Sequence, residues 1–330
     1  MKIRILKPGL LSTVQDMGRY HFLSQGVPVS GAMDGLSARI ANKAVGNGDN
    51  QAVIEFTYAD AAFKAETDVL IAYAGDGMRL QAGALILPPE RPVFIPSGAI
   101  IQLIHNSAGV HNYLSIAGGW DVPEVLGSTS TCLAASFGGF KGRPLQADDV
   151  LSGNDQLSDI SASLFSRLKS EQVNFAKWSI PRQLLLPSNR REIRVTPGRE
   201  ADWFNSQSVA DFFSAPYVLS RHSNRMGFHL EGPEIIRAKN DELISTAVTP
   251  GTIQVTGNGQ MILLMADCQT TGGYPRIAQV ASVDLPLCGQ LKPGDTIYFK
   301  EISRREAEVL YLKREDELSK LTTALKSIFL

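Results

Sequence analysis

Short apolar runs separated by glycine and proline constrain this chain of 330 residues more than any other feature. Runs rich in Val, Ile, Leu, Phe and Thr end at turn residues after a few positions, which is typical of all-β barrels and sandwiches. Examples are residues 52–58, 69–73, 79–82, 93–96, 100–104 and 113–116. The pattern predicts a mainly β fold in which helices are the minority.

Two segments instead show the spacing of amphipathic helices. Asp34 is a suitable N-cap for a helix with apolar residues at positions 36, 40, 41 and 44 and a stop at Gly46. The tail from about Arg304 repeats Leu and Ile at helical spacing, and a short helix is possible at residues 160–168. Both apolar stripes are interpreted as packing faces.

A weak internal repeat predicts two related β domains. Residues 142–150 resemble residues 289–297, and residues 78–83 resemble residues 228–232, with a nearly constant offset. We therefore predict a first domain at 1–152, a connection at 153–191, a second domain at 192–302 and a C-terminal helix at 303–330.

Composition limits the partners. Lys plus Arg total 32 against 33 for Asp plus Glu, so no electrostatic field favours nucleic acid or an anionic membrane. There is no secretory signal and no apolar run long enough to span a bilayer, so a cytoplasmic protein is expected. Three cysteines without a C-x-x-C pair and five histidines without ligand spacing predict neither disulfides nor a metal site. The missing G-x-x-x-x-G-K-[ST] loop indicates that ATP phosphates bind elsewhere.

The first polar, glycine-containing segment covers residues 12–19 and 26–34. Arg19 could clamp a carboxylate, Gln15 could orient it, and Ser30 could help to hold an anion near the start of the helix. The structural alternative is that Asp16 and Arg19 pair locally to shape the loop, while Asp34 only caps its helix.

The second segment is Ser223-Asn224-Arg225-Met226-Gly227. Asn224 and Arg225 offer donors that suit a tetrahedral or carbamate-like oxyanion. A tight turn stabilised by Asn224 is the alternative.

The third segment, residues 267–276, is the densest candidate site. Asp267 is a possible base, and Gly272 and Gly273 allow backbone amides to approach a ligand. Cys268 is expected to be a buried small hydrophobe, because no histidine lies nearby in sequence to activate it. The remaining hydrogen-bonding side chains are Gln269, Thr270 and Tyr274.

These segments and several others resemble, in order and over nearly the full length, the family known as the 5-oxoprolinase C subunit, allophanate hydrolase subunit 2 or the Kip antikinase antagonist. The matching stretches are 12–16, 26–28, 30–34, 41–42, 46–47, 118–119, 121–123, 126–128, 223–227, 250–254, 269–270, 272–275, 289–291 and 293–295.

The resemblance implies two cyclophilin-like β-barrel domains that assemble with a separate B subunit, and relatives that form the carboxyltransferase part of urea carboxylase. Ala32-Met33-Asp34 is not the Ala-Met-Lys-Met biotinylation site, and that site occurs nowhere else. No covalently bound cofactor is therefore expected, and any biotin must arrive on a partner.

Three functions follow as hypotheses. The first is ATP-dependent opening of 5-oxo-L-proline to L-glutamate, with this chain as the C subunit, inactive alone, beside a Kip inhibitor-like B subunit plus an ATP-handling A subunit. In it Arg19 or Arg225 holds the substrate carboxylate or an oxyanion, and Gln15, Asn224 and Gln269 orient it. The second is carboxyl transfer from partner-borne carboxybiotin to urea or a similar amide. The third is regulatory, with the chain antagonising a Kip-like inhibitor of a histidine kinase.

Overall fold

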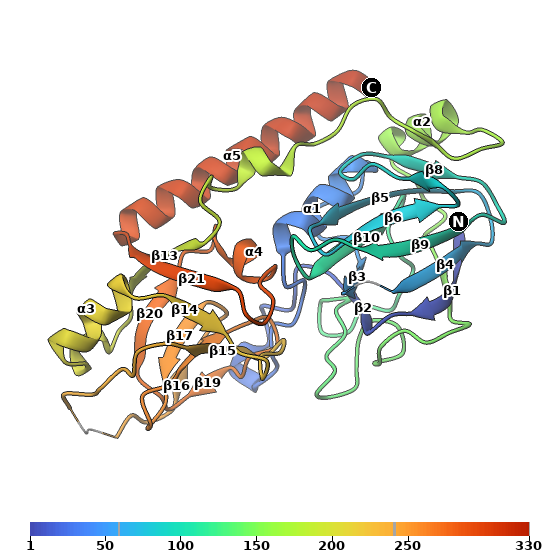
Figure 1. Cartoon of the computed structure of the whole chain (residues 1–330). Coiled ribbons are helices and arrows are strands. Elements are labelled where there is room, and N and C mark those ends of the chain that lie inside the picture. Colours follow the sequence, from blue (N-terminus) through green and yellow to red (C-terminus); the bar gives the residue numbers. More distant parts are fainter. Residues whose placement is uncertain (59, 240–241, 330) are drawn as a thin grey trace. The chain divides into compact units, whose positions relative to one another are not determined.

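The computed structural model describes residues 1–58, 60–239 and 242–329. Strands dominate (Figure 1), which confirms the predicted fold class. The chain divides into two compact units that are not continuous in sequence. Residues 1–19, 30–185 and those from Glu317 onward form the first unit, and residues 20–29 and 186–316 form the second. The predicted boundaries at 152, 191 and 302 divide the chain into continuous segments, whereas each of these two units combines segments that are separated in the sequence. Residue 330 of the predicted terminal helix lies outside the described residues.

The first unit contains two six-stranded sheets. In spatial order the first sheet is β11 (Val150–Ser152), β1 (Lys2–Pro8), β4 (Ala61–Ala65), β9 (Ile100–His105), β6 (Met78–Ala82) and β7 (Leu85–Ile86). The second sheet is β12 (Asn174–Phe175), β8 (Val93–Ile95), β5 (Val69–Gly75), β10 (His111–Ile116), β3 (Val53–Thr57) and β2 (Leu11–Gln15).

The core of this unit follows from strand alternation. Ile3 and Ile5 of β1 are buried, whereas their neighbours along the strand are not, so one face of the sheet points inward. Strand β5 is buried at every position, because α1 (Gly35–Ala44) packs against β5 and β10. The predicted apolar face of α1 is buried, and the Asp34 side chain caps the helix by accepting from Ser37 N, as predicted. Helix α2 (Asp159–Leu168) and the short helix η2 (Arg182–Leu185) complete the unit.

The second unit is built on a closed seven-stranded barrel. Its strands follow each other in the order β13 (Glu192–Pro197), β20 (Arg276–Val280), β17 (Thr252–Val255), β18 (Met261–Leu264), β15 (Gly227–Glu231), β14 (Tyr217–Leu219) and β21 (Thr296–Glu301). A short ribbon pairs β16 (Thr246–Ala247) with β19 (Thr271–Gly272). Its helices are η1 (Leu23–Gln25), η3 (Ala201–Trp203), α3 (Ser206–Ser214), α4 (Leu285–Cys288) and the first half of α5 (Arg304–Phe329).

Aromatic side chains pack α3 against the barrel. Phe212 of α3 stacks on Phe299 of β21 with ring centroids 4.6 Å apart, and Tyr217 lies beside both rings. Alternation along β21 places Ile297 and Phe299 inside. The helix is therefore held to the barrel by apolar burial, the largest favourable contribution to folding.

Each of the segments that resemble one another in sequence leads into a strand or forms one. Residues 142–150 lead into β11 and residues 289–297 lead into β21, while the other pair of similar segments forms β6 and β15.

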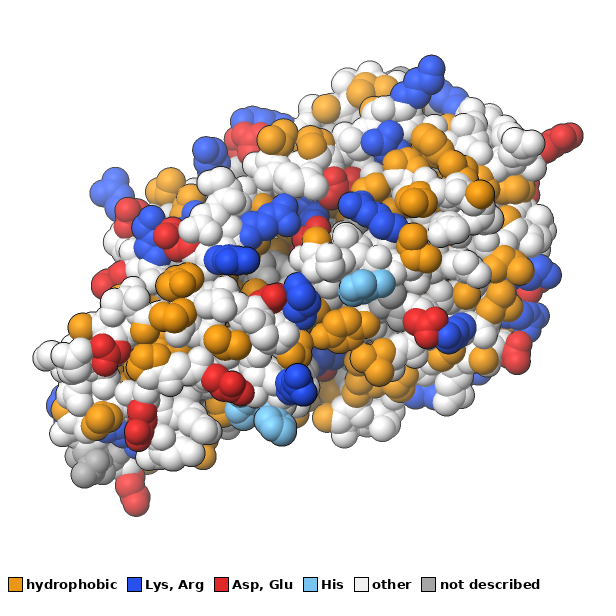
Figure 2. Space-filling model, in the orientation of Figure 1, with side chains coloured by type: hydrophobic (Ala, Val, Ile, Leu, Met, Phe, Trp, Pro, Cys, Tyr) orange, Lys and Arg blue, Asp and Glu red, His pale blue; other side chains and the backbone are white. Residues whose placement is uncertain are grey.

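Charged side chains of both signs are interspersed over the visible face (Figure 2), in keeping with the net charge of -1. Among the described residues, no helix combines the length and apolar character needed to cross a bilayer.

Candidate active site

An ion pair joins the second and third predicted segments in the second unit. Arg225 Nε lies 2.7 Å from Asp267 Oδ2, and a second hydrogen bond of 3.2 Å links Nη2 to Oδ1. Asp267 N also donates to the Arg225 carbonyl at 2.9 Å. Both side chains are about nine-tenths buried. The structure thus brings together two polar groups that lie 42 residues apart in the sequence.

Gln254 of β17 organises the rest of the third segment. Its side chain is buried, accepts from Gln269 Nε2 at 3.4 Å and donates to the Tyr274 carbonyl at 3.2 Å. A Cβ added at Gly272 would lie 2.5 Å from Gln254 Nε2, so only glycine fits there without a shift of that side chain. Sequence reasoning missed the role of Gln254, although the residue was visible in the matching stretch 250–254.

The remaining predicted residues of this unit occupy turns and the ribbon. Asn224 Oδ1 accepts from Met226 N at 2.8 Å, which is the turn-stabilising arrangement considered as its alternative role. The Thr270 carbonyl accepts from Val248 N at 3.0 Å. Gly273 lies near Ser245, and the Tyr274 side chain is half exposed. The Tyr274 and Gln269 side chains are both exposed and are therefore available to a ligand.

Cys268 lies between Asp267 and Gln269 but is buried among Val248 and Leu264. Burial raises the pKa of the Cys268 thiol to about 12, and the adjacent Asp267 carboxylate adds to the rise. A thiol with that pKa is protonated at neutral pH and is a poor nucleophile. This agrees with the prediction that Cys268 packs as a small hydrophobe.

Asp16 is the centre of the polar cluster in the first unit. Its carboxylate accepts from Ser128 Oγ at 2.7 Å, from Thr129 N at 2.7 Å and from Ser130 Oγ at 2.5 Å. It also accepts from Gly18 N at 2.8 Å. These hydrogen bonds hold the residue that follows β2 against residues 128–130, which lie 112 or more positions further along the chain.

The predicted binding residues of the first unit surround Asp16. Gln15 Nε2 donates to Thr13 Oγ1 at 2.9 Å, and Gln15 Oε1 is buried without a hydrogen bond in the described part of the chain. Arg19 is buried, donates to the Ser130 carbonyl at 2.5 Å and lies 4.8 Å over the Phe137 ring. These contacts favour a positioning role for Arg19 over direct contact with a substrate.

Ser30 occupies strained backbone beside the same loop. Its φ is 55°, in the left-handed region that a non-glycine residue rarely adopts, and its buried Oγ has no hydrogen bond among the described residues. The following Gly31 approaches Gly18 so closely that a Cβ would lie 2.9 Å from Gly18 N. The structure therefore holds Gln15, Arg19 and Ser30 in one region of the first unit.

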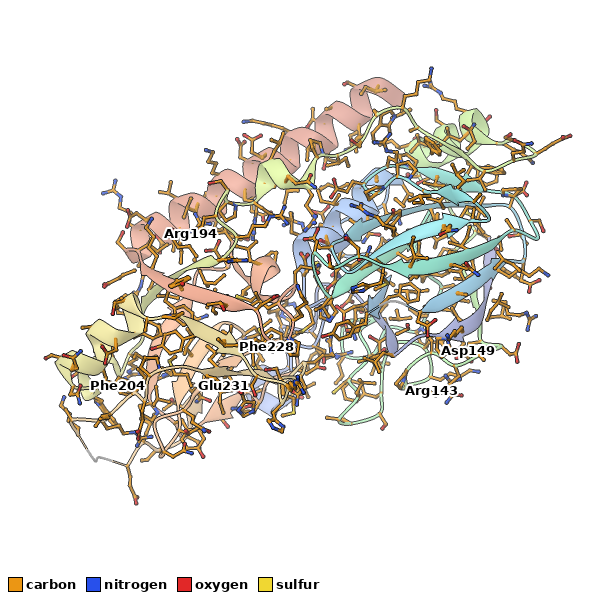
Figure 3. All side chains as sticks on the ribbon, in the orientation of Figure 1. Arg143, Asp149, Arg194, Phe204, Phe228 and Glu231 are labelled. Carbon is orange, nitrogen blue, oxygen red and sulfur yellow. The ribbon has the colours of Figure 1, made fainter. Side chains whose placement is uncertain are left out.

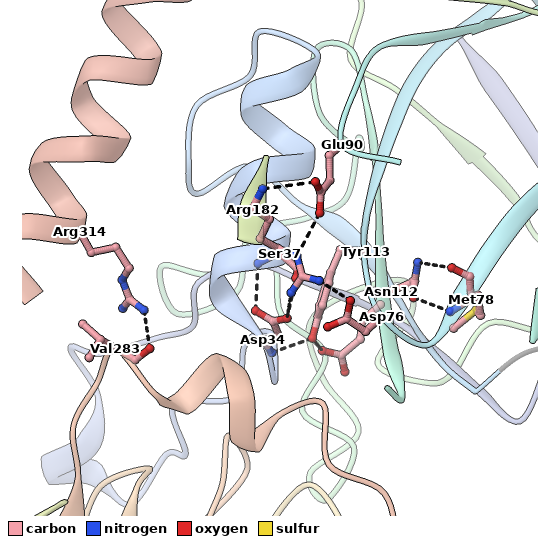
Figure 4. Close-up of polar contacts among 11 residues, drawn as sticks. Asp34, Ser37, Asp76, Met78, Glu90, Asn112, Tyr113, Arg182, Val283 and Arg314 are labelled. Carbon is pink, nitrogen blue, oxygen red and sulfur yellow. Dashed lines mark hydrogen bonds and ion pairs between the residues drawn. The ribbon is translucent and has the colours of Figure 1, made fainter. Parts of the chain in front are cut away.

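A buried charge cluster was not predicted at all. The Arg182 guanidinium lies 3.5 Å from Asp34 Oδ2 and 3.2 Å from Glu90 Oε1, and it also pairs with Asp76 (Figure 4). Burial by itself lowers the pKa of Arg182, but the three carboxylates outweigh burial and the net shift is upward. No motif surrounds Arg182 in the sequence, so nothing pointed to this contact.

The cluster continues through a buried tyrosine. Tyr113 Oη donates to Glu55 Oε2 and accepts from Asp34 N, at 2.8 Å and 2.7 Å. Glu55 Oε2 also accepts from Met33 N at 2.8 Å. Burial raises the pKa of Tyr113 well above its usual value, and the carboxylates of Glu55 and Asp34 add to the rise. This network fixes the chain just after Ser30 and at the start of α1.

The described residues hold no group of three or more His, Cys, Asp or Glu side chains arranged to bind a metal ion. The side chains of the clusters around Arg225, Asp16 and Arg182 carry carboxylate, amide, hydroxyl and guanidinium groups. Such groups bind, orient and polarise amides and carboxylates.

Comparison with known proteins identifies the class to which this fold and these clusters belong. Residues 25–301 match the model of the carboxyltransferase domain, subdomains A and B, and the chain belongs to that family. It is 37% identical over 307 residues to the 5-oxoprolinase C subunit of Escherichia coli (strain K12), covering 92% of this chain and 93% of that protein.

Larger proteins contain a similar region. The chain is 34% identical over 322 residues to the urea amidolyase of Lachancea kluyveri, covering 93% of this chain but 17% of that protein. The crystal structure of the K. lactis urea amidolyase superposes with a TM-score of 0.86 at 31% identity, covering 97% of this chain and 20% of that one. This likeness agrees with the two-domain β architecture implied by the family resemblance.

Proposed function

We propose that this protein is the C subunit of an ATP-dependent 5-oxoprolinase complex that converts 5-oxo-L-proline to L-glutamate. The observation that supports this most directly is the match, over 92% of this chain, to a protein named as the 5-oxoprolinase C subunit. That match covers 93% of the relative, whereas the urea amidolyase match covers 17% of a much longer chain.

In this proposal the chain is inactive alone and works in the cytoplasm with two partners, the Kip inhibitor-like B subunit plus the ATP-handling A subunit. ATP binds to a partner, in keeping with the missing phosphate-binding loop motif in the sequence. Hydrolysis of the lactam adds water to the ring carbonyl carbon and breaks its bond to nitrogen, which takes up a proton. Negative charge develops on the carbonyl oxygen as this happens.

The second-unit cluster offers groups for that chemistry. Gln269, held by Gln254, and the accessible Tyr274 hydroxyl are donors for the lactam oxygen. Arg225 holds the Asp267 carboxylate in place through two hydrogen bonds, so Asp267 is positioned to accept a proton or to orient water. Asn224 shapes the turn that presents Arg225.

Reconstitution with the two partner proteins tests this function. Glutamate release from 5-oxo-L-proline and ATP should require this chain, and Gln269→Ala should lower kcat by about 10-fold or more, the loss expected for a transition-state donor. Gln207→Ala is a matched control, because the exposed Gln207 donates to Asp211 of its own helix at 2.8 Å and lies outside the candidate segments. Absence of glutamate release from an intact complex would refute the assignment.

Carboxyl transfer is the second candidate, favoured by the family match to a carboxyltransferase domain. It requires carboxybiotin on a partner, since residues 32–34 do not form a biotinylation site. Avidin added to the reconstituted complex distinguishes the two. If avidin abolishes the activity of the complex, the result would support carboxyl transfer. If glutamate release is insensitive to avidin, the result would support the lactam-opening reaction.

A further inference from the structure

A pocket of about 780 Å³ lies within the second unit, between barrel strands β13, β17 and β20 and the first turns of α5. Every lining residue belongs to that unit. The volume is in the range of pockets that bind small organic molecules. None of the site residues predicted from the sequence lines it, so this pocket is a separate feature of the barrel.

The walls are mostly apolar. Ala247 of β16, Val248 just after it and Ala278 of β20 form one side, and Ala307 and Leu312 contribute from α5. The floor also offers a polar pair, in which Thr252 Oγ1 donates to Gln279 Oε1 at 2.8 Å. The Gln279 amide nitrogen donates in turn to the Pro250 carbonyl at 3.0 Å. Such a pocket suits a compact ligand with an apolar ring and a few polar groups.

Positive charge exceeds negative charge at the mouth. Arg276 is held by Glu200, with hydrogen bonds of 2.6 Å and 2.5 Å, and donates to the Ala247 carbonyl at 3.0 Å. Arg199 and Arg304 also line the pocket and are exposed, without an ion pair in the part of the chain that the structure describes. Glu308, one turn beyond Arg304, is the opposing carboxylate on the lining. Two available guanidinium groups favour an anionic ligand.

A second pocket of the same unit provides a contrast. Its volume is about 540 Å³, and its lining includes His222, His229, Glu231 and Glu234. Glu231 lies at the end of β15 (Figure 3). Among the described residues, two glutamates and no arginine line this second pocket, so it does not share the excess of positive charge of the pocket beside α5.

The pocket beside α5 shares a wall with the third predicted segment. Strand β16 pairs with β19, and Val248 N donates to the Thr270 carbonyl at 3.0 Å. Ala247 and Val248 therefore face the pocket while their backbone is bonded to the segment that bears Gln269 and Thr270. A ligand bound in this pocket would therefore influence the position of Gln269 and Thr270 through the ribbon of β16 and β19.

We propose that the pocket between the barrel and the first turns of α5 binds a small organic carboxylate, with Arg199 and Arg304 holding the carboxylate and Ala247 and Ala278 contacting the ring. The proposal rests on the proposed function for the identity of the ligand, which is a second molecule of 5-oxo-L-proline bound apart from the Gln269 and Tyr274 donors. That molecule has one carboxylate, a compact five-membered ring and an amide, which match the guanidinium groups, the apolar wall and the Thr252–Gln279 pair.

Calorimetric titration of the full chain, without its partner proteins or ATP, tests this. The probes are 5-oxo-L-proline and its neutral carboxamide, which keeps the ring and removes the charge. We expect the acid to bind and the carboxamide to bind roughly 10-fold more weakly, the loss of one charge-assisted hydrogen bond. Arg304→Gln should weaken the acid by a similar factor, whereas Arg305→Gln, a neighbour outside the lining, should leave its Kd unchanged.

Two further variants separate binding from damage to the fold. Glu308→Gln removes the opposing carboxylate and should tighten binding of the acid several-fold. Ala307→Trp fills the pocket without changing a charge and should abolish binding while the circular dichroism spectrum is retained. Failure of the acid to bind to the wild-type chain, or equal affinities for Arg304→Gln and Arg305→Gln, would overturn the proposal.

The same experiment distinguishes this proposal from the function on which it rests. If Arg304-dependent binding of the acid is found but the reconstituted complex releases no glutamate, the carboxylate pocket stands and the 5-oxoprolinase assignment fails. If the complex releases glutamate but Ala307→Trp binds the acid as wild type does, the assignment stands and the pocket proposal fails.

Discussion

Replacing Arg182 with Met should destabilise the first unit strongly. The guanidinium is 1% exposed and pairs with three carboxylates, of which Asp34 is 0% and Glu90 9% exposed. Methionine keeps much of the volume but removes the positive charge from the centre of the cluster. Breaking one buried ion pair from one side costs about 3–5 kcal/mol, a large share of a typical unfolding free energy of about 5–15 kcal/mol.

Differential scanning calorimetry measures this loss. For a unit of this size each kcal/mol lowers Tm by about 2–4 °C, so the transition of the first unit should move down by roughly 6–20 °C. Arg91→Met is the matched control. Arg91 contacts the Ala176 and Lys177 carbonyls at 3.2 Å and 3.5 Å rather than a carboxylate, so its loss should cost only about 1 kcal/mol.

A Tm for Arg182→Met within about 2 °C of wild type would refute this reasoning, as would equal costs for the two substitutions. Either result would mean that the cluster contributes no net stability beyond ordinary hydrogen bonds. Because the cluster also fixes Asp34 and the start of α1, the reconstituted Arg182→Met complex should lose glutamate release at assay temperatures above the onset of the lowered transition.

Three further predictions address single groups. Burial raises the pKa of Glu200, but hydrogen bonds from Arg276 outweigh burial, so the pKa is lowered overall. The ionised Glu200 therefore stabilises the fold above about pH 4.3, and this contribution is lost as pH falls through the lowered pKa. In urea unfolding, Glu200→Gln should make the free energy of unfolding fall less steeply toward acid pH. Cys268, with a pKa of about 12, should resist iodoacetamide at pH 8 in the native chain, and rapid native-state labelling followed by mass spectrometry would contradict its burial. Asp16→Ala should increase hydrogen exchange across residues 128–130, because the Asp16 carboxylate accepts from all three of these residues, and unchanged exchange there would show that the loop is fixed by other contacts.

The sequence by itself determined the class of fold and its local elements. Strand runs, the Asp34 cap and the apolar stripe of α1 are encoded by neighbouring residues, so periodicity and capping chemistry were enough to find them. The three polar segments were also visible, because glycine beside hydrogen-bonding side chains is a local pattern. The family resemblance then supplied the proposed function, which the local patterns alone did not.

Tertiary structure alone decided which polar groups meet. Asp16 and Ser128 lie 112 residues apart, Arg225 and Asp267 lie 42 apart, and Arg182 lies 92 from Glu90. Sequence periodicity reports which face of an element is buried, whereas a long-range ion pair depends on how strands and loops are brought together by the folded core. Pairing among the strands and closure of the barrel fix those distances, and no local signal in the chain encodes them.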